Sequence, residues 1–84
     1  MTALTKPTIH LNGTSREALL EQYRDACDAV RTAMKAVADA SPHGRDYYPQ
    51  GKEAINKAID EHVDRLRRLE GVLSELVQIG SDLA

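Results

Sequence analysis

Apolar residues recur at alternating steps of four and three along the C-terminal half of the chain. The series, which includes one histidine, is Ile55, Ile59, His62, Leu66, Leu69, Leu73 and Leu76. This heptad spacing places its members on one face of an α-helix and favours left-handed packing against another helix. Four further residues widen the face: Ala58, Val63, Val72 and Ile79. We therefore predict a long helix over residues 52–80, with Gly80 as its C-terminal stop.

A second helical pattern lies earlier in the chain, over residues 14–40. Its main apolar row is Leu19, Tyr23, Ala26, Val30, Ala33 and Val37, and a neighbouring row is Leu20, Cys27 and Met34. Thr14 followed by Glu17 fits a capping box, in which each side chain binds an orphan backbone N–H. Pro42 ends the pattern, because the residue before a proline resists the α region.

The composition favours helices over strands as the material of the core. The 84 residues include no Trp, no Phe and three Tyr, so the core is aliphatic, whereas strands favour aromatic and β-branched residues. We predict one all-α domain, an antiparallel two-helix hairpin preceded by an arm over residues 1–13, in which residues 8–11 are a short strand or an extended segment. A lone hairpin leaves wide apolar faces in water, so we expect a homodimeric four-helix bundle, or else a higher oligomer.

Charge and hydropathy narrow the possible partners. The net charge is −2, which gives no basic excess for non-specific binding to nucleic acid. No apolar run reaches the roughly 18 residues of a membrane span, and residues 1–7 contain no hydrophobic signal core. The single cysteine, Cys27, cannot form an internal disulfide, which is compatible with a reducing compartment. We expect a cytoplasmic protein that does not bind membranes.

The connection between the two predicted helices, residues 41–51, is richer in chemistry than a turn requires. Helix–helix connections usually run about 2–8 residues, whereas this loop carries five candidate binding residues: His43, Arg45, Asp46, Tyr47 and Tyr48. Arg45 can form a bidentate contact with carboxylate or phosphate, and the tyrosines offer rigid area for stacking or for a protein interface. In the structural alternative the tyrosines close the end of the bundle, Arg45 and Asp46 cap helix ends, and Pro49 starts the second helix.

Two features of the second helix allow both a functional and a structural interpretation. Arg65, Arg67 and Arg68 can hold a phosphate or an acidic partner, or they can be solvated and paired with neighbouring carboxylates. His62 is interpreted as a core histidine hydrogen-bonded to the opposite helix. We predict no metal site and no cofactor, because the di-iron motif needs a Glu three residues before the histidine, where Ile59 stands.

Two acidic pairs, Asp25 with Asp28 and Glu61 with Asp64, loosely resemble those of all-helical nucleotide pyrophosphohydrolases of the MazG type. The resemblance implies helices that hold Mg²⁺ against a nucleoside triphosphate. Here the first pair has Asp where that family has Glu, and the two pairs are further apart than is usual. Acidic residues three apart are common on solvated helix faces, so this enzyme is the remote alternative, and we predict no catalytic residues.

Two stretches of the sequence, TIHLNGTS at residues 8–15 and GRDYYPQG at residues 44–51, are followed by Glu61-His62. Together they resemble a group of small proteins from tailed phages and prophages, over most of the chain. The resemblance implies a viral accessory protein made inside a bacterium, a class that often blocks a host or defence protein or sequesters a nucleotide signal. We therefore expect a non-enzymatic protein that inhibits or modulates a host or defence protein through residues 41–51. The alternative is an oligomeric sponge for a nucleotide.

Overall fold

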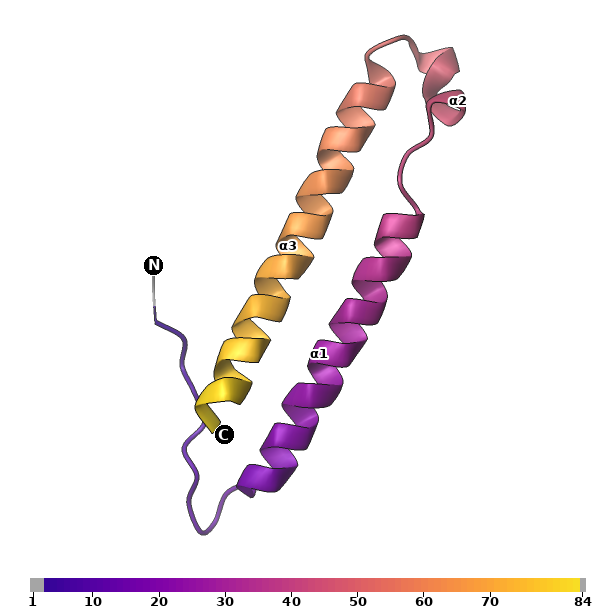
Figure 1. Ribbon diagram of the computed structural model, residues 1–84. Helices are drawn as coiled ribbons and strands as arrows, with labels where there is room; N and C mark the ends of the chain where they lie inside the picture. The colour runs from indigo at the N-terminus through magenta and orange to yellow at the C-terminus, as the bar shows by residue number, and fades with distance from the viewer. Residues whose placement is uncertain (1–2, 84) are drawn as a thin grey trace.

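The computed structural model describes residues 3–83, which form helices and connecting segments and, within that range, no strand. The elements in order are α1 (Arg16–Asp39), α2 (Gly44–Tyr47), the 3₁₀ turn η1 (Tyr48–Gln50) and α3 (Ala54–Leu83). The two long helices, α1 and α3, lie side by side and run in opposite directions (Figure 1). The predicted all-α class is confirmed, and α1 packs against α3.

The start of α1 is set by a serine cap. The Ser15 side chain accepts a hydrogen bond from the backbone N–H of Ala18 at 3.2 Å, while its own backbone is extended. The predicted capping box of Thr14 and Glu17 was wrong. Ser15 occupies the N-cap, and the residue three positions on, Ala18, has no side chain that can return a bond. Glu17 still favours the helix start, because a negative charge in the first turn interacts well with the helix dipole.

Both ends of α3 lie further along the chain than predicted. Pro49 lies in η1 and does not open the long helix, and Gly51, with a φ of 105°, interrupts the helical backbone before α3 begins. At the other end Gly80 does not stop the helix, which continues to Leu83. The added turn buries Leu83, which is only 6% exposed. That burial is the physical reason why the helix extends past the glycine.

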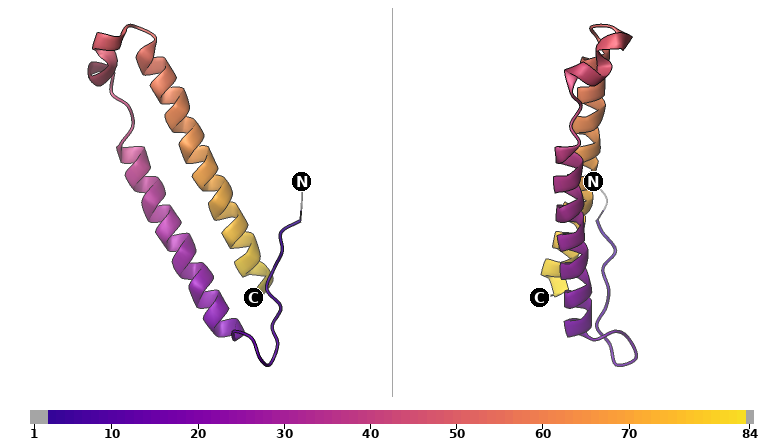
Figure 2. Two further views of the ribbon diagram at one scale, coloured as in Figure 1. Left: turned by 180° about the vertical axis from the view of Figure 1, so that it is seen from behind. Right: turned by 90° about the vertical axis from the view of Figure 1, so that its right-hand side faces the viewer.

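The N-terminal arm, from residue 3 to the start of α1, is non-helical and turns back beside the C-terminal end of α3 (Figure 2). The turn is closed by a hydrogen bond from the Gly13 N–H to the His10 carbonyl at 3.1 Å. Lys6 forms an ion pair with Asp82 of α3. Of the two predicted forms of the arm the extended one is found, and residues 1 and 2 lie outside the described residues.

The contact between α1 and α3 uses helix faces rotated slightly from those that the main apolar rows predict. On α1 the buried residue is Cys27, from the neighbouring row, whereas Ala33 of the main row is exposed. On α3, Ala58 and His62 are buried and Ile59 is 41% exposed. Successive helical residues differ by about 100° around the axis, so the rotation that turns Ala58 and His62 toward α1 moves Ile59 to the flank.

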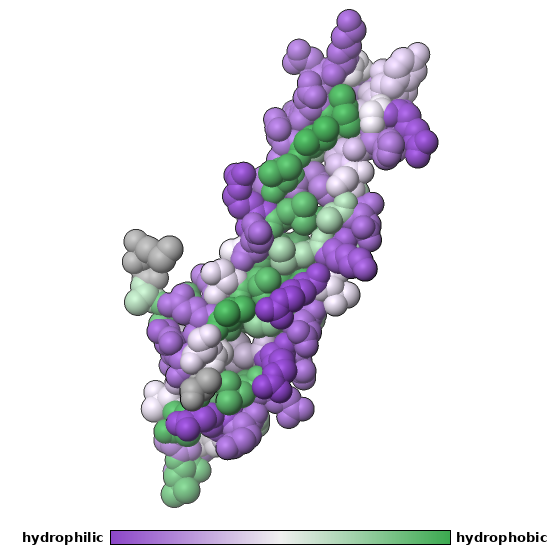
Figure 3. Space-filling model, in the orientation of Figure 1, coloured by the Kyte–Doolittle hydropathy of each residue, from purple (hydrophilic) through white to green (hydrophobic). Residues whose placement is uncertain are grey.

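The core of the helix pair is thin. Among residues 3–83 four are buried: Cys27, Ala58, His62 and Leu83. The radius of gyration is 18.3 Å, whereas a compact chain of this length has about 12 Å. The accessible surface of 6631 Å² exceeds by roughly a third the value of about 5,000 Å² expected for a compact protein of 9.3 kDa. Much apolar surface therefore stays uncovered, and Figure 3 shows a hydrophobic strip running along the pair.

Candidate functional site

The tip of the helix pair, residues 41–53, joins α1 to α3 and contains the predicted binding loop (Figure 1). The sequence predicts an irregular loop here, but α2 and η1 occupy most of it. Backbone bonds within these turns include Asp46 N–H to the His43 carbonyl at 3.0 Å and Gly51 N–H to the Tyr48 carbonyl at 3.3 Å. Because the turns satisfy their own backbone groups, the tip holds its side chains on helical backbone rather than on an open loop.

The two tyrosines of the tip differ in their exposure. Tyr48 is 82% exposed, whereas Tyr47 is half-buried. Tyr47 therefore suits the role of closing the end of the helix pair, and Tyr48 does not. Arg45, also exposed, precedes Tyr48 by three residues in consecutive helical turns. Residues three apart in a helix are neighbours on one side, so an aromatic ring and a guanidinium share one side of the tip.

The remaining predicted tip residues are also exposed. His43 is at the N-cap of α2 but forms no capping hydrogen bond with its side chain. Among the described residues neither Arg45 nor Asp46 has a side-chain hydrogen bond or ion pair. The capping roles weighed for Arg45 and Asp46 are therefore absent from the described part of the chain, and their charged groups remain available to a partner.

The basic cluster of α3 lies apart from the tip. Arg65 and Arg68 are both exposed, and Arg68 Nε lies 3.0 Å from an Asp64 carboxylate oxygen one helical turn away. Arg65 lies about 16 Å along the helix axis from Ala54, the first residue of α3, at a rise of 1.5 Å per residue. The predicted site residues thus fall into two groups, the tip and the α3 cluster, that the fold does not bring together.

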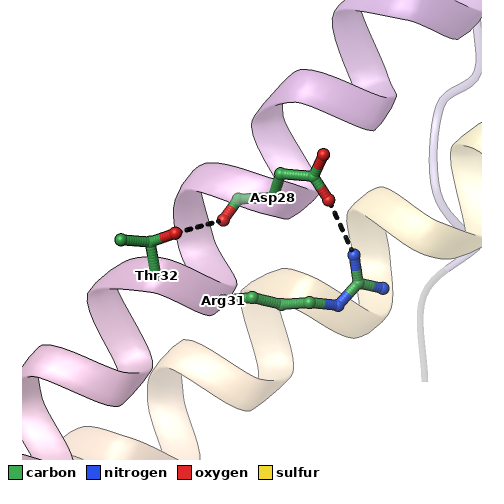
Figure 4. A network of polar contacts seen from close by, with 3 residues as sticks. All are labelled: Asp28, Arg31 and Thr32. Carbon is green, nitrogen blue, oxygen red and sulfur yellow. Dashed lines mark hydrogen bonds and ion pairs between the residues drawn. The ribbon is translucent and has the colours of Figure 1, made fainter.

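One member of each acidic pair, Asp28 or Asp64, forms an ion pair with an arginine of its own helix. The Asp28 carboxylate lies 3.3 Å from Arg31 Nη1, and the Thr32 hydroxyl donates to the Asp28 carbonyl at 3.0 Å (Figure 4). Asp64 pairs with Arg68 in the same local manner. The four acidic residues of the MazG-like pattern are exposed. Within residues 3–83 no group of three or more His, Cys, Asp or Glu is placed to hold a metal ion. Local pairing of this kind is typical of solvated helix faces.

His62 binds the opposite helix, as predicted. Its Nε2 donates a hydrogen bond to the Val37 carbonyl oxygen at 2.7 Å. The Val37 carbonyl oxygen lies in the last turn of α1, where it also accepts a hydrogen bond from the Ala40 backbone N–H at 3.1 Å. His62 therefore adds a second hydrogen bond to this carbonyl and ties α3 to the end of α1, which is a structural role.

Two shallow grooves between α1 and α3 were not predicted from the sequence. The first, of about 450 Å³, is lined by Met34, Lys35, Ala38, Val63, Leu66, Arg67 and Glu70. The second, of about 310 Å³, is lined by Leu20, Tyr23, Arg24, Cys27, Arg31, Leu76, Val77, Gly80 and Ser81. Apolar side chains from both helices mix with basic residues of α1 in each groove. The signal that could have located them is a second heptad series on α3, which includes Val63 and Val77.

Comparison of the chain with protein-family models, with curated proteins and with solved structures finds no match. The resemblance to phage proteins, the binding function and the cytoplasmic location therefore stay predictions from the sequence. In the part of the chain that the structure describes, no helix has both the length and the apolar character needed to cross a membrane.

Proposed function

We propose that the protein is a non-enzymatic binding protein that inhibits or modulates a host or defence protein of a bacterium through its tip. The observation that supports this most is the exposure of Tyr48, which is 82% exposed beside a half-buried Tyr47. Tyr and Arg are enriched among the residues that dominate the energy of protein interfaces. Arg45, on the same side of the tip, adds donors that can pair with a carboxylate of the partner.

The same proposal includes association of two copies into a four-helix bundle. The accessible surface of 6631 Å² is roughly 1,600 Å² above that of a compact protein of this mass. A standard interface buries about 800 Å² on each partner, so a second copy has ample surface to cover. The thin core supports the same conclusion, because small domains often gain the rest of their core by oligomerising.

The proposed tip contact is tested by placing a photo-crosslinking amino acid at position 48 in bacterial cells. The matched control carries it at position 11, because Leu11 is 98% exposed and lies in the N-terminal arm. We expect a discrete adduct with another protein from position 48 and none from position 11. The same adducts from both positions, or none from position 48, would contradict the tip as the contact surface.

A variant separates binding from folding once that partner is identified. Tyr48→Ala is expected to abolish capture of the partner, with the helical circular dichroism signal and the subunit count unchanged. Loss of the helical signal in this variant would instead mean that Tyr48 stabilises the fold, in which case the tip proposal fails.

A nucleotide sponge remains the second candidate. The sequence predicts that the tip tyrosines stack the base and that Arg45 or the Arg65–Arg68 cluster holds the phosphate, whereas the structure offers one groove as another site for the same ligand. The groove of about 310 Å³ between α1 and α3 is lined by Tyr23, Arg24 and Arg31 among others, which combines an aromatic ring with two guanidinium groups. A tight ligand at a hundred- to thousandfold excess over its dissociation constant stabilises the fold by about 3–4 kcal/mol. A thermal-shift panel of cyclic and linear nucleotides tests this candidate, with Arg31→Ala expected to remove the shift and Arg68→Ala to retain it. No shift across the panel would exclude it.

A further inference from the structure

α3 carries a second heptad series beside the face that contacts α1. Its members, in steps of four and three, are Ile59, Val63, Leu66, Glu70, Leu73 and Val77. Such spacing keeps them in one stripe along the helix, which shares Ile59, Leu66 and Leu73 with the first heptad series and adds Val63, Glu70 and Val77 on its flank. Ile59, Val63 and Val77 are each more than 40% exposed, Leu66 and Leu73 are half-buried, and Glu70 is the one polar member. This stripe, called the flank seam below, is therefore largely apolar, and three of its five apolar side chains are exposed to water.

The other flank of α3 does not offer a comparable surface. The corresponding series there is Arg65, Arg68, Val72, Glu75 and Ile79, in which three of the five side chains are charged. Val63 of the flank seam lines the first groove and Val77 lines the second, and residues of α1 line the opposite side of each groove. One face of the helix pair thus combines the seam and both grooves, and the strip in Figure 3 shows apolar residues bordered by polar ones on both sides.

The flank seam is complementary to itself when its direction is reversed. About a midpoint at residue 68, Ile59 pairs with Val77 and Val63 pairs with Leu73. Residue 68 is also at the middle of α3, which spans Ala54–Leu83. An antiparallel pair of α3 helices in this register therefore overlaps along the whole helix, and a surface that matches its own copy is what a two-fold dimer requires.

Glu70, the polar member of the flank seam, has a basic partner on the second copy in this antiparallel register. Reversal about residue 68 places Glu70 opposite Leu66 of the second copy, next to Arg67 of that copy. Arg67 and Glu70 both line the groove of about 450 Å³, so the two-fold operation brings a cation of each copy to the carboxylate of the other. Opposite charges that meet across an interface fix its register and exclude alternatives.

We infer that a second copy of this chain covers the flank seam, with the two α3 helices antiparallel about a two-fold axis near residue 68. This inference rests on the self-association proposed above and specifies its surface and orientation. The N-termini of the two α3 helices are then about 42 Å apart at 1.5 Å per residue. The two tips point to opposite ends of the dimer, and each dimer binds two partner molecules, one at each end.

A matched pair of substitutions tests the surface. Val63 of the flank seam is 46% exposed and Val72 of the other flank is 44% exposed, so they are alike in residue type, helix and exposure. We expect Val63→Lys to raise the dimer dissociation constant at least about a hundredfold, because a charge would be buried without a partner. Val72→Lys should leave it within about threefold. Equal effects from the two variants, or no effect of Val63→Lys, would overturn the inference.

The orientation is tested by distance measurement between spin labels in full-length protein. The label is placed on Asn56→Cys, in a Cys27→Ala background. The antiparallel register separates the two labels by about 36 Å along the axis. A bundle with both tips at the same end places them within about 20 Å, since packed helices lie 8–10 Å apart.

The outcomes separate this inference from the proposal on which it rests. A dimer by light scattering with the longer distance supports both statements. A dimer with the shorter distance overturns the orientation and leaves self-association standing. A monomer overturns self-association together with this inference, while the crosslinking result at position 48 still decides the function of the tip.

Discussion

His62 of α3 and Val37 of α1 are joined by a hydrogen bond of 2.7 Å between the imidazole Nε2 and the backbone carbonyl oxygen. In residues 3–83 it is the side-chain hydrogen bond that connects the two long helices, because the others lie within a single helix or turn. His62 is only 8% exposed, so little water competes for the carbonyl. The contact fixes the position of α3 along α1 next to the tip.

Removing this contact is expected to destabilise the fold. His62→Ala loses the hydrogen bond and leaves a buried gap, which should lower the free energy of unfolding by about 1–3 kcal/mol. The measurement is urea unfolding at a fixed protein concentration, because oligomerisation makes stability depend on concentration. His43→Ala, at an exposed position of the tip, should change the free energy by less than about 0.5 kcal/mol. Equal losses in the two variants would show that the contact with Val37 contributes nothing specific.

The position of the first helix cap can be tested with two neighbouring hydroxyl residues. Ser15 accepts the hydrogen bond from the Ala18 N–H, so Ser15→Ala is expected to lower the free energy of unfolding by about 1 kcal/mol. Thr14→Ala removes a hydroxyl next to the cap and should cost less than about 0.5 kcal/mol. Thermal unfolding followed by circular dichroism compares the two. The reverse order would place the cap at Thr14, as the capping box predicts.

The backbone of the tip depends on one glycine. Gly51 has a φ of 105°, a backbone conformation that residues with side chains rarely adopt. Gly44 serves as the control, because an ideal Cβ at this position meets no atom within 4 Å. Gly51→Ala should therefore cost about 1–3 kcal/mol. Gly44→Ala, in the helical backbone of α2, should be neutral or stabilising by up to about 1 kcal/mol, because alanine has less freedom than glycine in the unfolded chain. Chemical denaturation of both variants is the test, and a neutral Gly51→Ala would contradict the backbone conformation of the tip.

The last turn of α3 is expected to contribute through Leu83. This side chain is 6% exposed, whereas Leu11 in the arm is 98% exposed. Leu83→Ala should lower the free energy of unfolding by about 2–3 kcal/mol, since it removes buried apolar atoms. Leu11→Ala should change it by less than about 0.5 kcal/mol. If urea unfolding gives the same value for both, the helix does not gain from extending beyond Gly80.

The exact ends of the helices could not be predicted from the sequence. Ser15 and Thr14 are both good caps, and the choice between them depends on which backbone N–H the hydroxyl reaches. Gly80 is a common stop signal, but here the helix continues through it to Leu83, whose side chain is buried. At the tip, the sequence could not separate Tyr47 from Tyr48, because which of two adjacent rings packs depends on the rotation of a short helix against α3.

The heptad patterns of the sequence are enough to predict two long helices joined by a segment rich in polar and aromatic residues. Heptad periodicity is local, so it is readable without knowledge of the partner helix. Which rows of the two helices meet depends on how the helices pack, and this does not follow from the heptad pattern. The apolar faces are wider than one contact requires, and a shift of one residue rotates a face by about 100°. Packing against α1 therefore selected Ala58 and His62 for the contact and left Ile59 and Val63 exposed on the flank seam.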